Sequence, residues 1–139
     1  LQVLAIGTQA KIEVLRGDLA AAESNLQVAE EIIARTPTLP PWHLSAAATA
    51  SLLYSLERLQ HAAAGERRTL ARRLRRHLRH ATRIAAKVAV QRAEITRLAA
   101  LAHWRLGEHA RAHATWRRAM AIGTKLGAQP ELARLSLDL

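Results

Sequence analysis

Apolar residues recur three and four positions apart along most of the chain, which is the period of an amphipathic helix. The clearest stripe consists of Leu70, Leu74, Leu78, Ala81, Ile84, Ala85 and Val88. Applied to the whole sequence, this pattern predicts seven helices, over about 1–16, 19–35, 42–63, 66–88, 90–106, 108–125 and 130–139. In the first of them the stripe is expected to contain Leu4, Gln9, Ile12 and Leu15.

Glycine and proline mark the breaks between these helices. The breaks fall at Gly17, at the Pro-rich segment 36–41, at Gly65, which should end the third helix, at Gly107 and at Gly127. Asp18 can cap the second helix, because its carboxylate accepts a hydrogen bond from an unpaired backbone N–H. Gly127 should end the sixth helix in the left-handed conformation, so the run 123–127 is not expected to be a phosphate-binding loop.

The strongest signal is an internal repeat. The run Gly17-Asp18-Leu19-Ala20-Ala21-Ala22 aligns with Gly107-Glu108-His109-Ala110-Arg111-Ala112, and the register continues without a gap. It pairs Ala10 with Ala100, Leu26 with Trp116 and Ala29 with Ala119. Each unit is therefore predicted to be a helical hairpin in which alanines permit close contact and one bulky side chain fills the gap. A single hairpin cannot bury its apolar surface, so the hairpins should stack.

These units resemble the second-helix signature of the tetratricopeptide repeat family. The first helix departs from the family pattern, with Ala100 at the small-residue position and His103 in place of a tyrosine, and Thr124 replaces the closing proline. The resemblance implies an all-α, right-handed superhelix of antiparallel hairpins with about seven helices. The expected organisation is one domain, 1–139, with units 1–36, 41–89 and 90–126 and a terminal helix 130–139. In such a superhelix the first helices line a peptide groove, for which the candidates are Gln9, Glu13, Ser51, Ser55, Arg58, Arg97 and His103.

A second resemblance concerns the parent protein. The runs 41–45, 104–107 and 126–134, together with the Arg-rich fourth helix, look like the helical tails of large bacterial signalling ATPases. This resemblance implies a sensor or docking region of a cytoplasmic protein whose chemistry lies in another domain. The chain also begins at Leu1, without an initiator methionine, so we expect it to be part of a longer protein.

The amino-acid composition favours helices and excludes several kinds of functional site. The chain of 139 residues contains 30 Ala and 22 Leu against 12 Val and Ile together, which favours helix over sheet. Because there is no Cys, disulfides, thiolate metal sites and Cys nucleophiles are excluded. No apolar run is long enough to cross a membrane, so we expect a soluble chain.

Positive charge is concentrated in one part of the chain. The net charge is +10, and residues 66–97 hold eleven basic and two acidic residues. The exposed face of the fourth helix should carry an arginine ridge consisting of Arg68, Arg72, Arg75, Arg76, Arg79 and Arg83. The ridge is either a solvated face or a site for an acidic protein, peptide or domain of the same polypeptide. Nucleic acid is disfavoured as a ligand of the ridge because no aromatic residue is interleaved for base stacking. Membrane insertion is disfavoured because the Leu and Ala face of the helix is needed for packing on the neighbouring hairpins.

No catalytic residue, cofactor or metal site is predicted. His109 and His113, and likewise His77 and His80, have helical spacing but no accompanying carboxylate, so they are interpreted as exposed or packed side chains. Glu13 and Glu94 should form surface pairs with Arg16 and Arg97, and Trp104 and Trp116 should share one inter-helix core.

The sequence therefore predicts a non-catalytic protein-interaction or regulatory scaffold domain of a bacterial signalling or transcription-regulatory protein. Two alternatives stay open. One is a small-ligand sensor with a pocket between hairpins, and the other is sequence-independent nucleic-acid binding through the Arg-rich helix.

Overall fold

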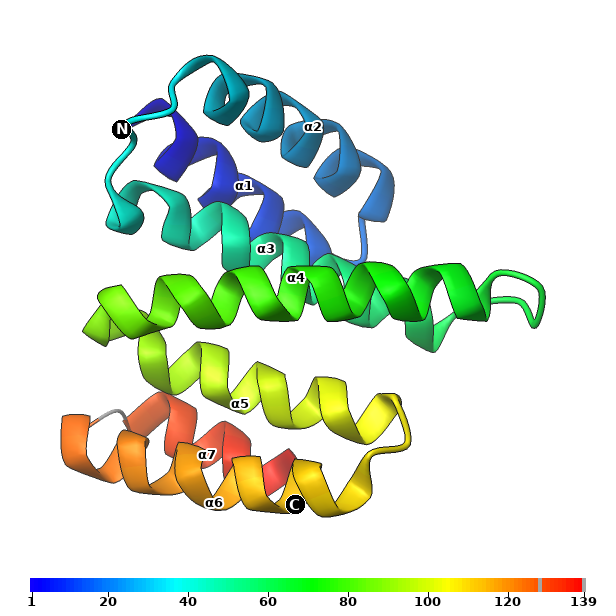
Figure 1. Cartoon of the computed structure of the whole chain (residues 1–139), viewed down its shortest axis with the longest axis vertical. Coiled ribbons are helices and arrows are strands. Elements are labelled where there is room, and N and C mark those ends of the chain that lie inside the picture. The colour runs from blue at the N-terminus through cyan, green and yellow to red at the C-terminus, as the bar shows by residue number, and fades with distance from the viewer. Residues whose placement is uncertain (128, 139) are drawn as a thin grey trace.

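The computed structural model describes residues 1–127 and 129–138, except for the side chain of Glu131. The described residues form seven α-helices and no strand (Figure 1), which confirms the predicted all-α class and the number of helices. The helices are α1 (Gln2–Arg16), α2 (Leu19–Arg35), α3 (Pro41–Gln60), α4 (Arg67–Lys87), α5 (Ala89–Arg105), α6 (His109–Leu126) and α7 (Gln129–Asp138). Two residues lie outside the described part of the chain. Ala128 belongs to the run 126–134 of the second resemblance, and Leu139 belongs to the predicted terminal helix.

One predicted helix end is wrong. α3 ends at Gln60 with His61 as its C-cap, so Gly65 does not terminate it. The segment between α3 and α4 is instead a turn whose backbone hydrogen bonds include Ala62 N–H to Leu59 O and Glu66 N–H to Ala63 O. The start of α3 follows the ordinary preference of proline for the first helical turn, because Pro41 is its first residue.

The turns at Gly17 and Gly107 have the same geometry. Gly17 has φ 81° and Gly107 has φ 80°, a left-handed conformation that glycine adopts without steric strain. Gly17 N–H donates to Val14 O and Asp18 N–H to Glu13 O, at 3.0 and 2.9 Å, and the corresponding bonds at Gly107 and Glu108 have the same lengths. Both turns are Schellman motifs, so the aligned sequence segments adopt the same local structure.

Packing follows the order of the chain. Helices α1 and α2, α3 and α4, and α5 and α6 form hairpins, and α1, α3, α5 and α7 also contact one another in succession (Figure 1). Each of α2, α4 and α6 packs on its hairpin partner and on the next helix along the chain. Among the described residues the backbone of α4 does not approach that of α2 or α6. The structure has one hollow between α2 and α4 and another between α4 and α6.

The core confirms the predicted stripe of α4 and contains the matched positions of the repeat. All seven members of the α4 stripe are buried, as are Leu52, Leu53, Tyr54, Leu56 and Leu59 of α3. The repeat positions Ala10, Ala22, Leu26, Ala29, Ala100, Ala112, Trp116 and Ala119 are buried too. Close packing of small residues against one bulky residue thus occurs in both matched hairpins.

The predicted stripe of α1 is wrong. Ile12 and Leu15 are exposed and Gln9 is at the surface, whereas Val3, Gly7, Ala10 and Val14 are buried. The reason is the close approach of α1 to α3. A Cβ added at Gly7 would lie 2.8 Å from the carbonyl carbon of Ala46 and would also meet the backbone N of Ala47. Small residues therefore form the closest contact, with Val3 and Val14 buried in the same face, whereas Ile12 and Leu15 are left exposed.

Ion pairs connect hairpins that are distant in sequence. Lys11 of α1 pairs with Glu94 of α5, and Arg97 of α5 pairs with Asp138 of α7 at 3.1 Å. The predicted surface pairs are therefore wrong: Glu94 pairs with another hairpin, and Glu13 accepts hydrogen bonds from Gln9 and Asn25. The Lys11–Glu94 and Arg97–Asp138 pairs therefore connect different parts of the stack, whereas the contacts of Glu13 stay within the first hairpin.

Candidate functional site

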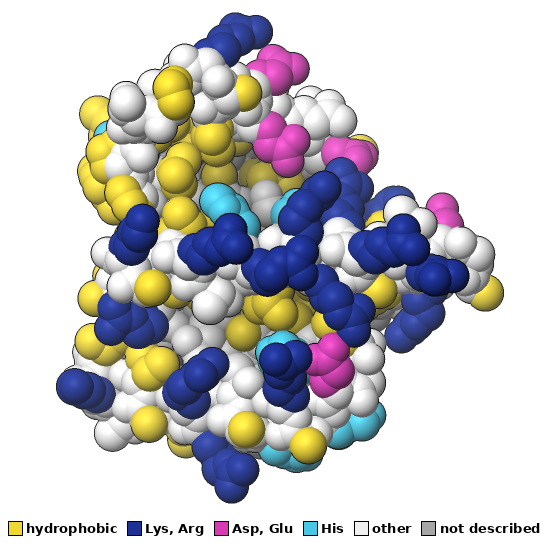
Figure 2. Space-filling view, viewed as in Figure 1, with side chains coloured by type: hydrophobic (Ala, Val, Ile, Leu, Met, Phe, Trp, Pro, Cys, Tyr) yellow, Lys and Arg dark blue, Asp and Glu magenta, His cyan; other side chains and the backbone are white. Residues whose placement is uncertain are grey.

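The arginine ridge lies on the outer face of α4. Its six members are all exposed, opposite the buried leucine stripe, and Figure 2 shows Lys and Arg side chains in a row along this helix. Arg73, which sequence reasoning left out of the ridge, is partly buried with its guanidinium carbon 6.0 Å from the centre of the Tyr54 ring. The ridge is thus a surface feature, while Arg73 belongs to the packing of α4 on α3.

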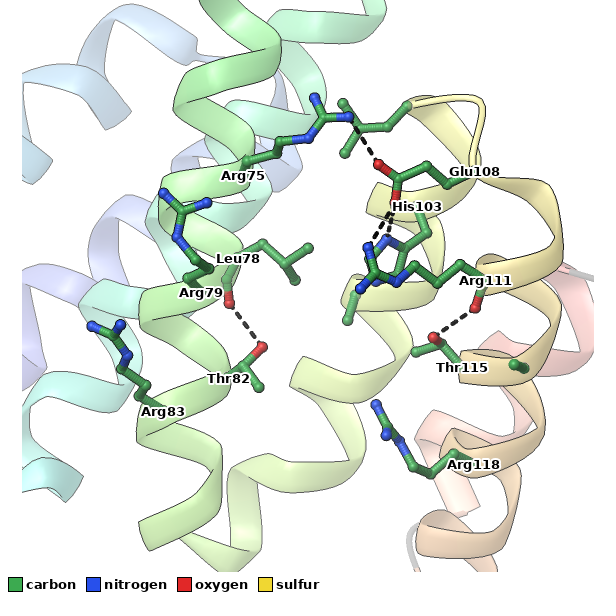
Figure 3. Close-up of a pocket in the computed structure, with 13 residues that line it drawn as sticks. Arg75, Leu78, Arg79, Thr82, Arg83, His103, Glu108, Arg111, Thr115 and Arg118 are labelled. Carbon is green, nitrogen blue, oxygen red and sulfur yellow. Dashed lines mark hydrogen bonds and ion pairs between the residues drawn. The ribbon is translucent and has the colours of Figure 1, made fainter.

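The hollow between α4 and α6, which we call the basic groove, has a volume of about 700 Å³. Arg75, Arg79 and Arg83 of α4 line one side of it, and Arg111 and Arg118 of α6 line the other. In Figure 3 Arg75 and Arg118 point into the gap between the two helices, whereas the guanidinium groups of Arg79 and Arg83 lie on the side of α4 away from α6. Its floor includes Leu78, Ala99 and Leu106. In Figure 2 a hydrophobic strip is visible below the row of Lys and Arg, so cationic walls enclose an apolar floor.

Glu108 lies at one end of the basic groove and binds three cationic or hydrogen-bonding groups. Its carboxylate accepts from Arg75 at 2.8 Å, from His103 Nδ1 at 2.8 Å and from Arg111 at 3.5 Å (Figure 3). Burial alone raises the pKa of Glu108, but the hydrogen bonds from His103 and Arg75 outweigh it and lower the pKa below its ordinary value. The groove therefore already holds one ionised carboxylate in an arginine and histidine cage.

The acidic residues of the two matched turns make different contacts. Asp18, at the equivalent position, caps α2 by accepting a hydrogen bond from Ala21 N–H at 3.1 Å. Glu108 makes no such capping bond, and its longer side chain extends into the groove. The same turn thus supplies a helix cap in one hairpin and an anion in the other.

The rest of the basic groove carries uncompensated charge. Arg79, Arg83 and Arg118 line it without a carboxylate partner among residues 1–127 and 129–138. The hydroxyls of Thr82 and Thr115 donate to the carbonyls of Leu78 and Arg111, at 2.8 and 2.7 Å, so their hydrogens are already used. The threonine hydroxyls therefore offer no further donor, and the guanidinium groups supply donors that suit carboxylate or phosphate oxygens.

The structure does not bring the predicted groove residues together. Only His103 lines the basic groove, whereas Ser51 lines the hollow on the other side of α4. The remaining candidates make other contacts: Gln9 and Glu13 with each other, Ser55 with His77, and Arg97 with Asp138, while Arg58 has a buried Nε. Sequence reasoning missed Arg111, Arg118 and Glu108. Arg111 and Arg118 are two helical turns apart, a spacing that could have indicated a second cationic face.

The tryptophans share one cluster with two histidines. Trp104 and Trp116 have ring centroids 5.7 Å apart, but only Trp116 is buried, while Trp104 is 41% exposed. His109 and His113 lie 4.2 and 5.7 Å from the Trp104 ring, edge to face. In the described part of the chain no three His, Asp or Glu side chains are grouped so that they could hold a metal ion. The i, i+4 histidines therefore pack on Trp104.

None of the helices in the described segments is both long and apolar enough to cross a bilayer. Comparisons of the chain with protein-family models, curated proteins and solved structures found no match.

Proposed function

We propose that this chain is a non-catalytic, tetratricopeptide-like interaction module of a bacterial signalling protein, and that its basic groove binds an acidic protein segment. One observation carries the proposal: five arginines surround a hollow of about 700 Å³ in which Glu108 is the one carboxylate among the described lining residues. The segment belongs either to another protein or to another domain of the same polypeptide.

The chemistry of the basic groove favours an acidic peptide over nucleic acid. Guanidinium groups bind carboxylates in bidentate geometry, and the apolar floor can contact the methylene groups of glutamate or an interspersed apolar side chain. Base stacking requires exposed aromatic rings, and no aromatic residue other than His103 is among the described groove residues. His103 is already held by Glu108 at 2.8 Å.

The contacts of Glu108 support the proposal that the groove binds a ligand carboxylate. Its oxygens occupy donors of Arg75, His103 and Arg111 at one end of the groove. Arg118 offers the same kind of donor farther along, and Arg79 and Arg83 also line the groove, with guanidinium groups that lie on the side of α4 away from α6 (Figure 3). An extended acidic segment that runs parallel to α4 would place successive carboxylates along this row.

The packing supports the tetratricopeptide-like part of the proposal. Hairpin partners contact each other, the first helices of successive hairpins contact each other, and the second helices remain apart. The Gly17 and Gly107 turns have matching φ angles and hydrogen bonds. We include a right-handed superhelix in the proposal because this handedness belongs to the family that the repeat resembles.

A titration followed by NMR locates the site. A short Glu-rich peptide should shift the backbone amide signals of Ala99, Ala114, Thr115 and Arg118 in low salt, and less so in high salt, because added ions screen the charges. Amides of α1, such as Ala5 and Thr8, serve as the internal reference. Shifts confined to α1 and α2, or no shifts at all, would contradict the proposal.

A further inference from the structure

A second hollow lies between α2 and α4, above α3, and has a different character. Its inner part has a volume of about 250 Å³. Apolar side chains make up most of its wall: Leu26, Ala29 and Ile33 from α2, and Leu44, Ala47 and Ala48 from α3. We call it the α2–α4 pocket.

The mouth of this pocket is cationic. Glu30, His77 and His80 line both the inner part and an outer part that Arg76, Arg79 and Arg83 complete. Figure 2 shows histidine side chains between a hydrophobic area and the row of Lys and Arg along α4. An apolar interior therefore opens directly onto guanidinium groups, with Glu30 as the one described carboxylate at the rim.

The imidazole of His77, which lines the pocket, is neutral. His77 Nδ1 is hydrogen-bonded with Ser55 Oγ at 2.5 Å, and Ser55 is buried. Burial, followed by the neighbouring cations Arg76 and Arg73, lowers the pKa of His77 to about 4, so the imidazole is uncharged at neutral pH. An apolar group that enters the pocket therefore meets an uncharged imidazole at His77, and Glu30 is the one described carboxylate in the same lining.

We propose that the α2–α4 pocket binds an amphiphilic anion, with a linear alkyl or acyl chain in the interior and its carboxylate or phosphate against Arg76, Arg83 and His80. Small-ligand sites are mostly apolar hollows with a few polar groups that fix orientation, and this pocket has that composition. Burial of the chain supplies the affinity, and the guanidinium groups orient the anionic end. The site goes beyond the proposed peptide groove and lies on the opposite side of α4.

Some residues separate the two sites in an experiment. Arg79 and Arg83 line both hollows and cannot distinguish them. Arg76, Ala34 and Glu30 line only the α2–α4 side. Ala34 is exposed on α2, so a larger side chain there can fill the mouth without entering the core.

Isothermal titration with decanoate and decyl phosphate, below their micelle-forming concentrations, tests the proposal. We expect both to bind, with decanol at least about tenfold weaker because it lacks the charge that the arginines recognise. The compound that binds more tightly shows whether the site prefers a carboxylate or a phosphate head group. Binding of decanol equal to that of decanoate, or no binding of either anion, would overturn the proposal.

Variants place the ligand. Ala34→Phe should abolish binding by filling the mouth, Arg76→Gln should weaken it several-fold, and Glu30→Gln should strengthen it by removing a repulsive charge. Arg68→Gln, on the same helix and exposed but outside both hollows, should leave the affinity unchanged. Circular dichroism checks that each variant is folded. Unchanged affinity in both Ala34→Phe and Arg76→Gln would refute the location, whatever the outcome for the basic groove.

Discussion

The carboxylate of Glu108 lies 2.8 Å from a guanidinium nitrogen of Arg75, although the two residues are 33 positions apart in sequence. The contact joins the residue before α6 to the middle of α4 across one end of the basic groove. Any acidic ligand that reaches this end must compete with Glu108 for the same donors. Glu108 therefore connects the two sides of the groove and, under the proposed function, competes with an acidic ligand.

Replacement of Glu108 by glutamine should strengthen binding of an acidic peptide. Glu108→Gln removes the negative charge that faces Arg75 and Arg111 but keeps a side chain of the same size. We expect affinity for a Glu-rich peptide to rise several-fold, while stability falls by about 1 kcal/mol or less, the typical value of a solvent-accessible pair. Calorimetric titration and urea denaturation measure the two effects. An affinity equal to or below that of the wild type would show that Glu108 does not compete with the ligand.

His77 should make the protein sensitive to moderate acid. Its pKa is lowered from 6.5 to about 4, first by burial and then by Arg76 and Arg73. As the pH falls below 6.5, His77 is protonated in the unfolded chain but stays neutral in the folded protein until about pH 4. The unfolded state is therefore stabilised in this interval. The free energy of unfolding keeps its full value above pH 6.5 and decreases between pH 6.5 and 4.

The variant His77→Gln isolates this effect, because all other histidines remain. Between pH 6.5 and 4 the wild type should lose about 2 kcal/mol of unfolding free energy more than the variant, allowing for partial exposure of the ring. Urea denaturation at several pH values measures the difference. Parallel pH profiles for the two proteins would be incompatible with a neutral, partly buried His77.

Gly7 should be intolerant of a side chain. An added Cβ would meet the backbone of Ala46 and Ala47, which cannot move aside as a flexible side chain could. We expect Gly7→Ala to destabilise the fold by about 1–3 kcal/mol or more, even though alanine is the better helix former. Gly65→Ala is the matched control, since a Cβ there meets nothing within 4 Å. Equal thermal stabilities of the two variants would disprove the close contact between α1 and α3.

Periodicity predicted the elements because the local signals are strong. The α4 stripe from Leu70 to Val88 is unbroken and fully buried, and Gly17, Gly107 and Gly127 all have positive φ. In α1 the same reasoning failed, since it assumed that the larger apolar residues face inwards. The actual contact uses Gly7 and Ala10, and residue size alone does not reveal how closely two backbones approach.

The site was harder to predict than the fold. Sequence alone identified the ridge on α4, including Arg75, Arg79 and Arg83, because those residues are local to one helix. It did not reveal that α6 faces this ridge across α5, which depends on how the hairpins stack. Arg111, Arg118 and Glu108 therefore became visible as partners of the ridge only in three dimensions.

The most direct test of the proposed function compares two variants with the same change in net charge. Arg111→Glu with Arg118→Glu reverses charge inside the basic groove, whereas Arg16→Glu with Arg117→Glu does so at exposed positions outside it. We predict that the groove variant binds a Glu-rich peptide at least about tenfold more weakly than the wild type, and the control within about twofold. Equal weakening of both variants would mean that only overall charge attracts the peptide, and would contradict a binding site between α4 and α6.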